Sequence, residues 1–461
     1  MNLAAVVLAA GIGKRMKSGV PKVLHPVLGR PMLSYVIDAV RGISPRKIVV
    51  VLGRGRDDVK ESLGQVGVLF AEQKVQLGTG HAAGSARNAL AGFKGNILIL
   101  NGDFPLITSK SLNNLVKKHI DGSADVSFLT ADIADPSGYG RVLRNVKGGV
   151  EKIIEDKDAS PVEKKITEIN SGTYCVKSGF LWEALKGVGS GNRQKEYYLT
   201  DIIEIARKKS RKILGVKSRD GSEALGVNDR AQLSEVEALL RKRINDSLMR
   251  AGVSMVDPGT TFVSPDAKIG ADTLIYPNTY IYGNTVIGAG SSLGPGVWIE
   301  DSVLGKGVTV RLSSYISNCK IGDNVTVGPF AHIRPEAEIM DGAKIGNFVE
   351  IKKSRIGSGS KVPHLSYIGD AVIGKDVNIG AGTITCNYDG FRKHETVIED
   401  DVFIGSDTML VAPIKVGRGA TTGAGSTITK DVPEGALAIG RAKQTVIENW
   451  SRKPREGKGK K

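Results

Sequence analysis

A period of six residues governs the second half of this chain of 461 residues. From about residue 263, aliphatic residues recur every six positions, and many are followed by glycine, as in Ile269-Gly270 and Ile404-Gly405. An aliphatic residue every six positions, followed by glycine, is typical of the hexapeptide repeat. Each hexad of this repeat forms a short strand and a turn, and three hexads complete one coil. The sequence therefore predicts a left-handed parallel β-helix of roughly nine coils, with the aliphatic side chains stacked inside.

The glycine content agrees with this prediction, because 58 of the residues are glycine while only 5% are aromatic. The chain has no Gly-X-Y period of the collagen type, and its 41% of hydrophobic residues exclude a globally disordered protein. We expect the glycines of the hexads to provide turn conformations that other residues resist.

The first 228 residues have a different pattern, in which short aliphatic segments alternate with segments of helical composition. The segments Val6–Ala10, Lys47–Leu52 and Ile97–Leu100 are nearly free of polar residues, as in strands buried on both faces. Between them, Met32–Val40 and Gly80–Ala91 have helical composition. The alternation predicts an α/β Rossmann-like domain with a mostly parallel sheet and helices on both faces. Ligands of such folds bind at the carboxyl ends of the strands.

Residues 229–250 separate the two patterns. Apolar residues recur at steps of three and four from Leu233 to Leu248, and Gly252 and Pro258 follow at positions suited to end a helix. The segment predicts a connecting helix of about 20 residues, although an amphipathic helix packed against one domain satisfies the same pattern. The predicted division is 1–228 for the α/β domain, 229–251 for the connecting helix and 252–461 for the β-helix domain.

The chain is basic, with 64 Lys and Arg residues against 48 Asp and Glu residues and a formal net charge of +16. Six basic residues and one acidic residue lie in the tail 452–461, which we expect to be a solvated end. The remaining excess suits anionic small substrates, and no motif of a nucleic-acid-binding fold accompanies it. We therefore expect no nucleic acid among the partners.

Cysteine usage and the N-terminus indicate the compartment. The three cysteines, Cys175, Cys319 and Cys386, are far apart and outside any CxxC motif, which favours a reducing environment without disulfides. The short apolar N-terminus lacks a preceding basic region, so a buried strand explains it better than a signal peptide. No apolar run approaches the roughly 20 residues of a membrane span. The sequence predicts a cytoplasmic protein.

A glycine-rich turn follows the first predicted strand. Gly11 and Gly13 would allow backbone N–H groups to approach phosphate oxygens, and Lys14, Arg15 and Lys22 would add cationic donors. The segment lacks the third glycine of a dinucleotide-binding motif, and the chain has no GK[ST] of a P-loop. The basic residues beside the glycines favour phosphate binding over an ordinary turn.

Asp103 follows another predicted strand, in the sequence Asn101-Gly102-Asp103. A carboxylate at this edge of a sheet can hold a divalent cation that bridges nucleotide phosphates. A helix N-cap or a turn explains a single aspartate equally well.

Two features of the β-helix half point to chemistry. Between Ile384 and Ile398 the hexads stop, and the polar insert Thr385–Thr396 predicts a loop that is either a binding loop or a neutral insertion. His364 lies in another polar segment, Pro363–Gly369, and the titration range of histidine suits a general base. Taken alone, such a histidine is more often a surface or packed residue.

The motifs follow one another in the order of a known enzyme family. The first half contains LAAGxGxRM, PKVLH, QLGTGHA, Gly-Asp before a proline, GYGR, a glutamate before Asp-Lys-Asp, Asn-Ser-Gly, Glu-Tyr-Tyr-Leu-Thr-Asp and Gly-Val-Asn. This series resembles a sugar-nucleotide pyrophosphorylase domain. With the β-helix, the chain resembles the family of bacterial bifunctional N-acetylglucosamine-1-phosphate uridylyltransferase/glucosamine-1-phosphate N-acetyltransferases. The resemblance covers everything except the basic tail.

For the first domain, the resemblance implies uridylyl transfer from UTP to N-acetylglucosamine 1-phosphate with release of pyrophosphate. It implies one or two Mg²⁺ ions held by Asp103 and Asn228. Arg15 and Lys22 would be catalytic residues that stabilise the phosphates. In the implied site, uracil would be contacted by Gln73, Gly78 and Thr79. The sugar would be contacted by Gly140, Glu155 and Asn170. The full implied UDP-N-acetylglucosamine site is Leu8, Ala9, Ala10, Gly11, Lys22, Gln73, Gly78, Thr79, Asn101, Gly102, Asp103, Gly140, Glu155, Asn170 and Asn228.

For the β-helix, the resemblance implies acetyl transfer from acetyl-CoA to glucosamine 1-phosphate. His364 would be the general base, with Glu350 behind it. The sites would lie between neighbouring β-helices of a homotrimer. The implied ligands are Arg334, Lys352, Tyr367 and Asn378 for glucosamine 1-phosphate, and Ala381, Asn387, Tyr388, Ser406, Ala424 and Arg441 for acetyl-CoA.

Three places depart from the family pattern. Asn101 stands where the family often has Tyr, Ile12 and Lys14 replace residues of a more usual Lys-Gly-Thr, and Val362-Pro363 replaces a common Ala-Gly.

Two alternative functions are compatible with parts of the same pattern. One is a single-activity pyrophosphorylase whose β-helix only trimerises it, and the other is a non-catalytic nucleotide sensor. The sensor is disfavoured because Arg15, Lys22 and Asp103 are all present. The scaffold is disfavoured by the presence of the second set, which is Glu350, His364, Asn387 and Arg441.

Overall fold

The computed structural model describes residues 2–53, 57–64, 67–448 and 450, so the predicted basic tail at 452–461 lies outside the described residues. The chain divides into two compact units, Met1–Ile244 and Asn245–Lys461. The boundary between them falls inside helix α7 (Arg230–Arg250), which lies where the sequence predicts a helix over 229–250. Across the described residues, none of the helices has the length and hydrophobicity that a bilayer span requires.

The first unit is built on a nine-stranded sheet that is mostly parallel, as predicted. Only β10 runs antiparallel to its neighbours β6 and β7 on the main path, and β8 and β9 form an antiparallel extension. The main order is β11 (Ile213–Lys217), β7 (Val126–Asp132), β10 (Glu168–Lys177), β6 (Asn96–Asn101), β1 (Leu3–Ala9), β4 (Lys47–Gly53) and β5 (Leu69–Gln73), with β8 (Arg141–Arg144) and β9 (Val150–Ile154) off this path.

Helices cover both faces of this sheet. Because successive side chains of a strand point to opposite faces, Val6 of β1 belongs to one apolar core and Val7 to the other. The helices are α1 (Met32–Arg41), α2 (Asp57–Leu63), α3 (Thr79–Ser85), α4 (Ser109–Asp121), α5 (Ser178–Ala184) and α6 (Asp201–Lys208). The short elements are 3₁₀ turns η1 (Lys14–Met16), η2 (Lys22–Leu24), η3 (Glu163–Lys165) and η4 (Gly221–Ala224), and strands β2 (Pro26–Val27) and β3 (Arg30–Pro31).

Helix α3 is shorter than the helix predicted over Gly80–Ala91. It ends at Ser85, and the residues that follow form turns such as Leu90 N–H to Arg87 O at 3.2 Å. Gly84 and Ser85 are weak helix formers, which favours an early end. The turns still bring Leu90 into the apolar core, where it is buried.

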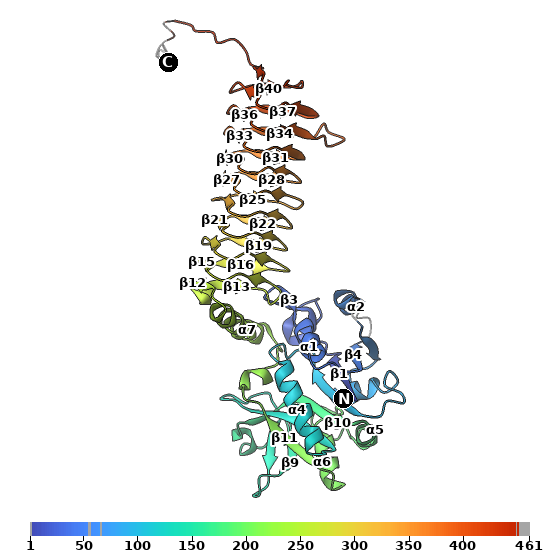
Figure 1. Ribbon diagram of the computed structural model, residues 1–461. Coiled ribbons are helices and arrows are strands. Elements are labelled where there is room, and N and C mark those ends of the chain that lie inside the picture. Colours follow the sequence, from blue (N-terminus) through green and yellow to red (C-terminus); the bar gives the residue numbers. More distant parts are fainter. Residues whose placement is uncertain (1, 54–56, 65–66, 449, 451–461) are drawn as a thin grey trace, which may run out of the picture. The chain divides into compact units, whose positions relative to one another are not determined.

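The second unit is a parallel β-helix, which confirms the predicted fold class (Figure 1). From β12 to β37, each strand pairs in parallel with the strand three positions later in the chain, and β39 pairs with β41, so the strands stack into three sheets. The repeating aliphatic residues point inward, as Ile345 and Val362 show, and both are buried. A 3₁₀ turn η5 (Pro258–Thr260) lies near the start of this unit.

In each of the three sheets the strands stack in chain order. The first sheet contains β12 (Ser254–Met255), β15 (Leu274–Ile275), β18 (Ser292–Leu293), β21 (Thr309–Val310), β24 (Thr326–Val327), β27 (Lys344–Asn347), β30 (Lys361–His364), β33 (Asn378–Ile379), β36 (Phe403–Ile404), β39 (Thr421–Thr422) and β41 (Leu437–Ala438). The second contains β13 (Thr261–Val263), β16 (Thr279–Tyr282), β19 (Trp298–Glu300), β22 (Tyr315–Ser317), β25 (His332–Ile333), β28 (Glu350–Lys352), β31 (Tyr367–Gly369), β34 (Ile384–Cys386), β37 (Met409–Val411) and β40 (Thr427–Ile428). The third contains β14 (Lys268–Ile269), β17 (Val286–Ile287), β20 (Val303–Leu304), β23 (Lys320–Ile321), β26 (Glu338–Ile339), β29 (Arg355–Ile356), β32 (Ala371–Ile373), β35 (Thr396–Ile398) and β38 (Ile414–Val416).

The glycine that follows the aliphatic residue has a different role from the expected one. The φ of Gly288 lies outside the left-handed region, but a Cβ atom there would lie 2.5 Å from the backbone carbon of Gly305 in the next coil. The left-handed turn comes later in the hexad, as at Gly290 with φ +71°. Close packing of successive coils, and not turn conformation, therefore requires glycine directly after the aliphatic residue.

Candidate active sites

The carboxyl ends of β1 and β6 bring the first set of predicted residues together. These parallel strands place Leu8 opposite Asn101, and the Gly102 N–H donates to the Leu8 carbonyl at 2.8 Å. The glycine-rich turn after β1 therefore begins beside the Asn-Gly-Asp segment after β6. Asn101 also lies close over the backbone of Gly172, because a Cβ atom on that glycine would be 2.4 Å from the Asn101 amide nitrogen.

Lys22, Asp103 and Asn228 converge at this edge of the sheet. The Lys22 ammonium forms an ion pair with the Asp103 carboxylate and lies 3.5 Å from Asn228 Oδ1. The Val227 N–H donates to the Asp103 carbonyl at 3.0 Å, which ties the two oxygen-bearing segments together. Gly13 lies against the aliphatic part of Lys22, since a Cβ atom on Gly13 would be 2.7 Å from Lys22 Cβ.

This convergence fits a bound cation. A carboxylate and an amide oxygen are hard donors of the kind that Mg²⁺ prefers, and a side-chain cation already lies within reach of both. Among the described residues, no group of three or more His, Cys, Asp or Glu side chains forms a self-contained metal site. Water and substrate oxygens would therefore have to complete the coordination shell of an ion held by Asp103 and Asn228.

Arg15 does not belong to the cluster of Lys22, Asp103 and Asn228. It lies in η1 (Lys14–Met16), its side chain is exposed, and it makes no hydrogen bond to any residue that the structure describes. Met16 in the same turn is buried, and its carbonyl accepts from Arg230 Nε at 3.1 Å, so the turn itself is anchored.

Gln73, Gly78 and Thr79 lie together where β5 meets α3. The Gln73 amide nitrogen donates to the Gly78 carbonyl at 3.1 Å and lies 3.0 Å from His81 Nδ1. Since a carbonyl only accepts, the amide oxygen of Gln73 must face the other way. Thr79 Oγ1 accepts from the Leu199 N–H at 3.0 Å. His81, the histidine of the QLGTGHA motif, is thus a neighbour of the predicted uracil contacts, although the sequence assigned it no role in the site.

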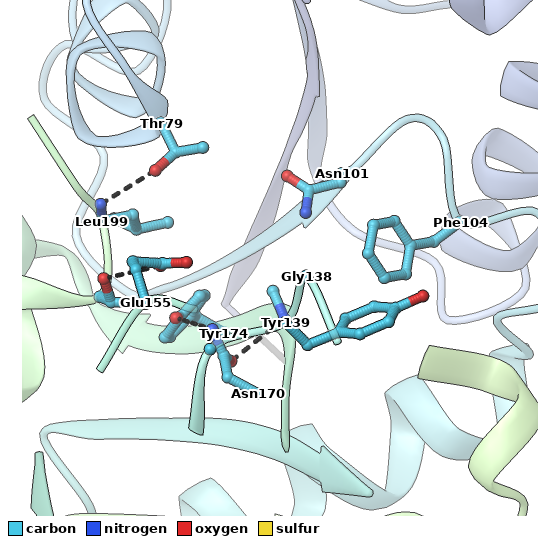
Figure 2. Close-up of a pocket in the computed structure, with 12 residues that line it drawn as sticks. Thr79, Asn101, Phe104, Gly138, Tyr139, Glu155, Asn170, Tyr174 and Leu199 are labelled. Carbon is cyan, nitrogen blue, oxygen red and sulfur yellow. Dashed lines mark hydrogen bonds between the residues drawn. The ribbon is translucent and has the colours of Figure 1, made fainter. Parts of the chain in front are cut away.

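The predicted sugar residues line one pocket (Figure 2). Gly140, Glu155 and Asn170 face it, together with Thr79 and Asn101. The other lining residues were not predicted, although the GYGR and Glu-Tyr-Tyr-Leu-Thr-Asp motifs contain several of them. The remaining lining residues are Phe104, Gly138, Tyr139, Gly172, Tyr174, Leu199 and Thr200.

Hydrogen bonds orient the polar groups of this pocket. Glu155 Oε1 accepts from Thr200 Oγ1 at 3.1 Å, and the Asn170 amide nitrogen donates to the Tyr174 hydroxyl at 2.7 Å. Burial raises the pKa of Glu155, and nearby Asp201 adds to the effect. Burial likewise raises the pKa of Tyr174, so its hydroxyl keeps its proton. The arrangement suits a neutral polyhydroxyl ligand such as a sugar, which needs both donors and acceptors.

In the β-helix, five residues occupy the same corner of successive coils. Backbone hydrogen bonds from the following residue connect them coil by coil, for example Leu365 N–H to Asn347 O at 3.0 Å and Asp407 N–H to Ala381 O at 2.6 Å. We call these residues the corner column: Asn347, His364, Ala381, Ser406 and Ala424. Arg441 donates to the Ala424 carbonyl at 2.8 Å, at the far end of the column. Four of the predicted acetyl-CoA and catalytic residues are therefore aligned along the axis of the β-helix.

The predicted phosphate-binding cations lie beside this column, on the second sheet. Arg334 donates to Glu350 Oε1 at 2.6 Å, and Glu350 is the register partner of Tyr367 in the next coil. The neighbouring Lys393 ammonium lowers the pKa of Lys352. Asn378 lies apart from them, on the first sheet opposite Lys361. Two close ammonium groups favour the binding of an anion.

Lys393 comes from the predicted insert, in which the resemblance implied roles only for Asn387 and Tyr388. The insert projects between β34 and β35 and is closed by a bridge between Tyr388 and Lys393 (Figure 1). Asn387 is buried and donates to Asp370 at 2.6 Å, while Tyr388 is exposed. Asp370 also lies 3.7 Å from the Lys393 ammonium, so it holds the base of the loop beside Lys352.

Within this chain, Asn347 and not Glu350 is the side chain that the structure places in hydrogen-bond contact with His364, and the placement of Glu350 behind His364 stays a prediction. His364 Nδ1 lies 2.7 Å from Asn347 Oδ1, whereas the Glu350 carboxylate is paired with Arg334. Strand register is the reason, because β27 and β30 place Asn347 directly opposite His364. Pro363, a departure from the family pattern, is accommodated in β30 without loss of this register.

Comparisons with known proteins cover nearly the whole chain. A model of the MobA-like NTP transferase domain matches residues 5–161, and a model of the bacterial transferase hexapeptide repeat matches residues 266–301, 318–353 and 395–430. The chain is 50% identical to the "Bifunctional protein GlmU" of Halalkalibacterium halodurans, over 97% of this chain and 98% of that one.

Further relatives carry the same name. The chain is 49% identical to the protein of Geotalea uraniireducens over 98% of this chain and 99% of that one, and 51% identical to the protein of Caldanaerobacter subterraneus over 97% of each. The nucleotidyltransferase model thus matches the first part of the chain and the hexapeptide model the second, and the relatives match nearly the whole length. The chain belongs to the GlmU family of bifunctional transferases.

Proposed function

We propose that the chain catalyses two consecutive reactions. The β-helix unit acetylates glucosamine 1-phosphate with acetyl-CoA, and the α/β unit then transfers a uridylyl group from UTP to the product, forming UDP-N-acetylglucosamine. The observation that carries the proposal is the convergence of Lys22, Asp103 and Asn228, which brings a cation and two oxygen donors together across 206 residues of sequence. Family membership and the aligned corner column support the second activity.

In the uridylyl reaction, a phosphate oxygen of N-acetylglucosamine 1-phosphate attacks the α-phosphorus of UTP, and the bond to pyrophosphate breaks. Lys22 and Arg15 stabilise the charge on the phosphate oxygens. Asp103 and Asn228 would hold Mg²⁺, which supplies further positive charge when it is bound. The exposed Arg15 is free to close on the triphosphate, because the structure shows it without a hydrogen-bond partner among the described residues.

The base and the sugar are bound on either side of this cluster. Gln73, Gly78 and Thr79 contact uracil, and the free amide oxygen of Gln73 suits the N3–H donor of that base. Gly140, Glu155 and Asn170 bind the sugar hydroxyls and the acetamido group in the pocket. The backbone from Leu8 to Gly11 and the segment Asn101–Asp103 surround the phosphates.

In the acetyl reaction, the amine of glucosamine 1-phosphate attacks the thioester carbon, and the bond to the CoA sulfur breaks. His364 Nε2 takes the proton that the amine loses. Arg334, Lys352, Tyr367 and Asn378 bind the sugar phosphate. Acetyl-CoA lies along the β-helix axis, in contact with Ala381, Asn387, Tyr388, Ser406, Ala424 and Arg441.

The assembly and the compartment belong to the same proposal. His364, Ser406, Ala424 and Arg441 are exposed on the surface of a single β-helix, so a neighbouring copy in a homotrimer would enclose the substrates. A cytoplasmic location is consistent with the cysteines, since Cys175, Cys319 and Cys386 are all free.

Paired assays of the purified full chain test the two activities separately. One assay supplies acetyl-CoA and glucosamine 1-phosphate and follows release of the CoA thiol. The other supplies UTP, Mg²⁺ and N-acetylglucosamine 1-phosphate and follows pyrophosphate. Asp103→Ala should abolish pyrophosphate release and leave CoA release intact, while His364→Ala should do the reverse.

The pattern of losses decides between the hypotheses. A chain that releases pyrophosphate but never CoA would be a pyrophosphorylase with a β-helix scaffold. Loss of both activities in both folded variants would refute the two-site model. A circular dichroism spectrum that matches the wild-type spectrum shows that each variant is folded.

A further inference from the structure

We propose that Asn347 is the positioning residue for His364 in acetyl transfer. The inference rests on the proposed role of His364 as general base and adds a residue that lies outside the implied acetyl-transfer site. Asn347 Oδ1 lies 2.7 Å from His364 Nδ1, and it is the only side chain that hydrogen bonds to the imidazole within the part of the chain that the structure describes.

The backbone holds these two side chains in register. Asn347 and His364 are direct partners of neighbouring strands, and the Leu365 N–H donates to the Asn347 carbonyl at 3.0 Å. The residues that follow them, Phe348 and Leu365, both adopt left-handed conformations with φ of +56° and +48°. Because these two corners have the same conformation and stack in adjacent coils, the side chains of Asn347 and His364 lie side by side.

The chemistry of the contact selects one tautomer of the imidazole. An amide oxygen only accepts, so Asn347 Oδ1 favours the form of His364 that carries its proton on Nδ1. The lone pair is then on Nε2, which is the atom that has to accept the proton of the attacking amine. Without this acceptor the neutral imidazole divides between two tautomers, and only one of them presents a base at Nε2.

The corner offers no competing charge. The adjacent positions of the coils on either side, Gly346–Phe348 and Gly380–Gly382, carry no titratable side chain. The Glu350 carboxylate, which the family resemblance suggested for this role, is occupied by Arg334. An amide therefore orients the base without adding negative charge beside it.

The test uses Asn347→Ala and Asn347→Asp in the full chain, with both activities measured. We expect Asn347→Ala to lower kcat of acetyl transfer by roughly 10-fold to 100-fold, the range for residues that orient a reacting group, with KM of both substrates within about twofold. Asn347→Asp keeps the acceptor and adds a negative charge 2.7 Å from Nδ1. It should restore most of the rate at high pH and move the acid limb of the pH–rate profile upward by about one unit.

Nitrogen-15 NMR of histidine-labelled protein gives an independent readout. In the wild type, His364 should show the proton on Nδ1, and Asn347→Ala should shift the tautomer population toward Nε2–H. Asn284, an exposed asparagine of the same unit, provides matched controls, so Asn284→Ala and Asn284→Asp should leave kcat and the pH profile unchanged.

The outcomes separate this inference from the proposed function. If His364→Ala keeps acetyl transfer, the proposed function of the β-helix is wrong. If His364→Ala is inactive while Asn347→Ala has a wild-type kcat, only the positioning role of Asn347 is wrong. The positioning role of Asn347 would also be wrong if the pH profile of Asn347→Asp were unshifted, or if wild-type His364 carried its proton on Nε2.

Discussion

The Lys22 ammonium and the Asp103 carboxylate form an ion pair between residues 81 positions apart in the sequence. Both side chains are largely shielded from solvent, at 13% and 14% exposure, so the pair is less screened than a surface salt bridge. A cationic side chain thus lies next to the oxygen atoms that would hold a metal ion, and the phosphates of UTP would bring further negative charge to the same point.

Removing the Lys22 charge should therefore damage uridylyl transfer specifically. We expect Lys22→Met to lower kcat/KM of the pyrophosphate-releasing reaction by about 100-fold or more, because it removes a cation that stabilises developing phosphate charge. CoA release should be unchanged. Lys17→Met, at an exposed lysine of the same loop, is the control and should keep most of the activity. Equal losses in both variants would mean that the loss reflects net charge and not position.

Removal of divalent metal should separate the two reactions. With EDTA in excess over Mg²⁺, uridylyl transfer should cease, because Asp103 and Asn228 are the donors that we assign to the ion. Acetyl transfer should continue at its original rate in the same sample. A parallel loss of CoA release on chelation would contradict the assignment, and addition of excess Mg²⁺ should restore the uridylyl activity.

His81 should influence recognition of uracil through Gln73. The Gln73 amide nitrogen is 3.0 Å from His81 Nδ1 and donates to the Gly78 carbonyl, so the free amide oxygen is held toward the base. We expect His81→Phe, which has no acceptor, to raise KM for UTP about tenfold and to reduce the preference for UTP over CTP. His81→Asn retains an acceptor and should lose much less. Unchanged discrimination in His81→Phe would show that the Gly78 carbonyl alone orients the amide.

Asp201 should destabilise the α/β unit near neutral pH. Burial raises the pKa of Asp201 to about 6 from 3.8, so ionisation costs more in the folded than in the unfolded state. The penalty is absent below pH 3.8, grows as the pH rises through about 6, and is complete above that. Allowing for solvent screening, Asp201→Asn should raise stability at pH 8 by about 1 kcal/mol, or 2–4 °C in Tm, and by less at pH 5. Asp135→Asn, at a fully exposed site with a lowered pKa, should give no gain at either pH.

Gly288 should be intolerant of even one added methyl group. A Cβ atom there would lie 2.5 Å from both the carbon and the oxygen of the Gly305 backbone, so adjacent coils would have to separate. We expect Gly288→Ala to lower the free energy of unfolding by about 1–3 kcal/mol in urea titrations. Gly290→Asn lies in open space at φ +71°, a conformation that Asn tolerates, and should cost less than about 0.5 kcal/mol. Similar losses in both variants would argue against coil packing as the cause.

The sequence predicted the fold of both halves because each has a local period that reflects burial. Residues such as Ile345 and Val362 point inward at every turn of the repeat, and the apolar strand β1 is buried along its whole length. The same sequence did not predict why glycine follows the aliphatic residue, because the contact that excludes a side chain at Gly288 comes from the next coil. It also overestimated helix α3, which ends at Ser85 after the weak helix former Gly84, although Leu90 beyond it is still buried in the core.

Motif order in the sequence was enough to name most candidate site residues, but only the tertiary structure decided which of them meet. His364 is 14 positions from Glu350 and 17 from Asn347, yet it contacts Asn347, because a neighbour in a β-helix lies one coil away and strand register selects it. Likewise, Lys393 reaches Lys352 only through the fold of the insert. Periodicity determines which side chains are buried, whereas register and loop closure determine which polar groups touch, and that information is not local to any segment of the chain.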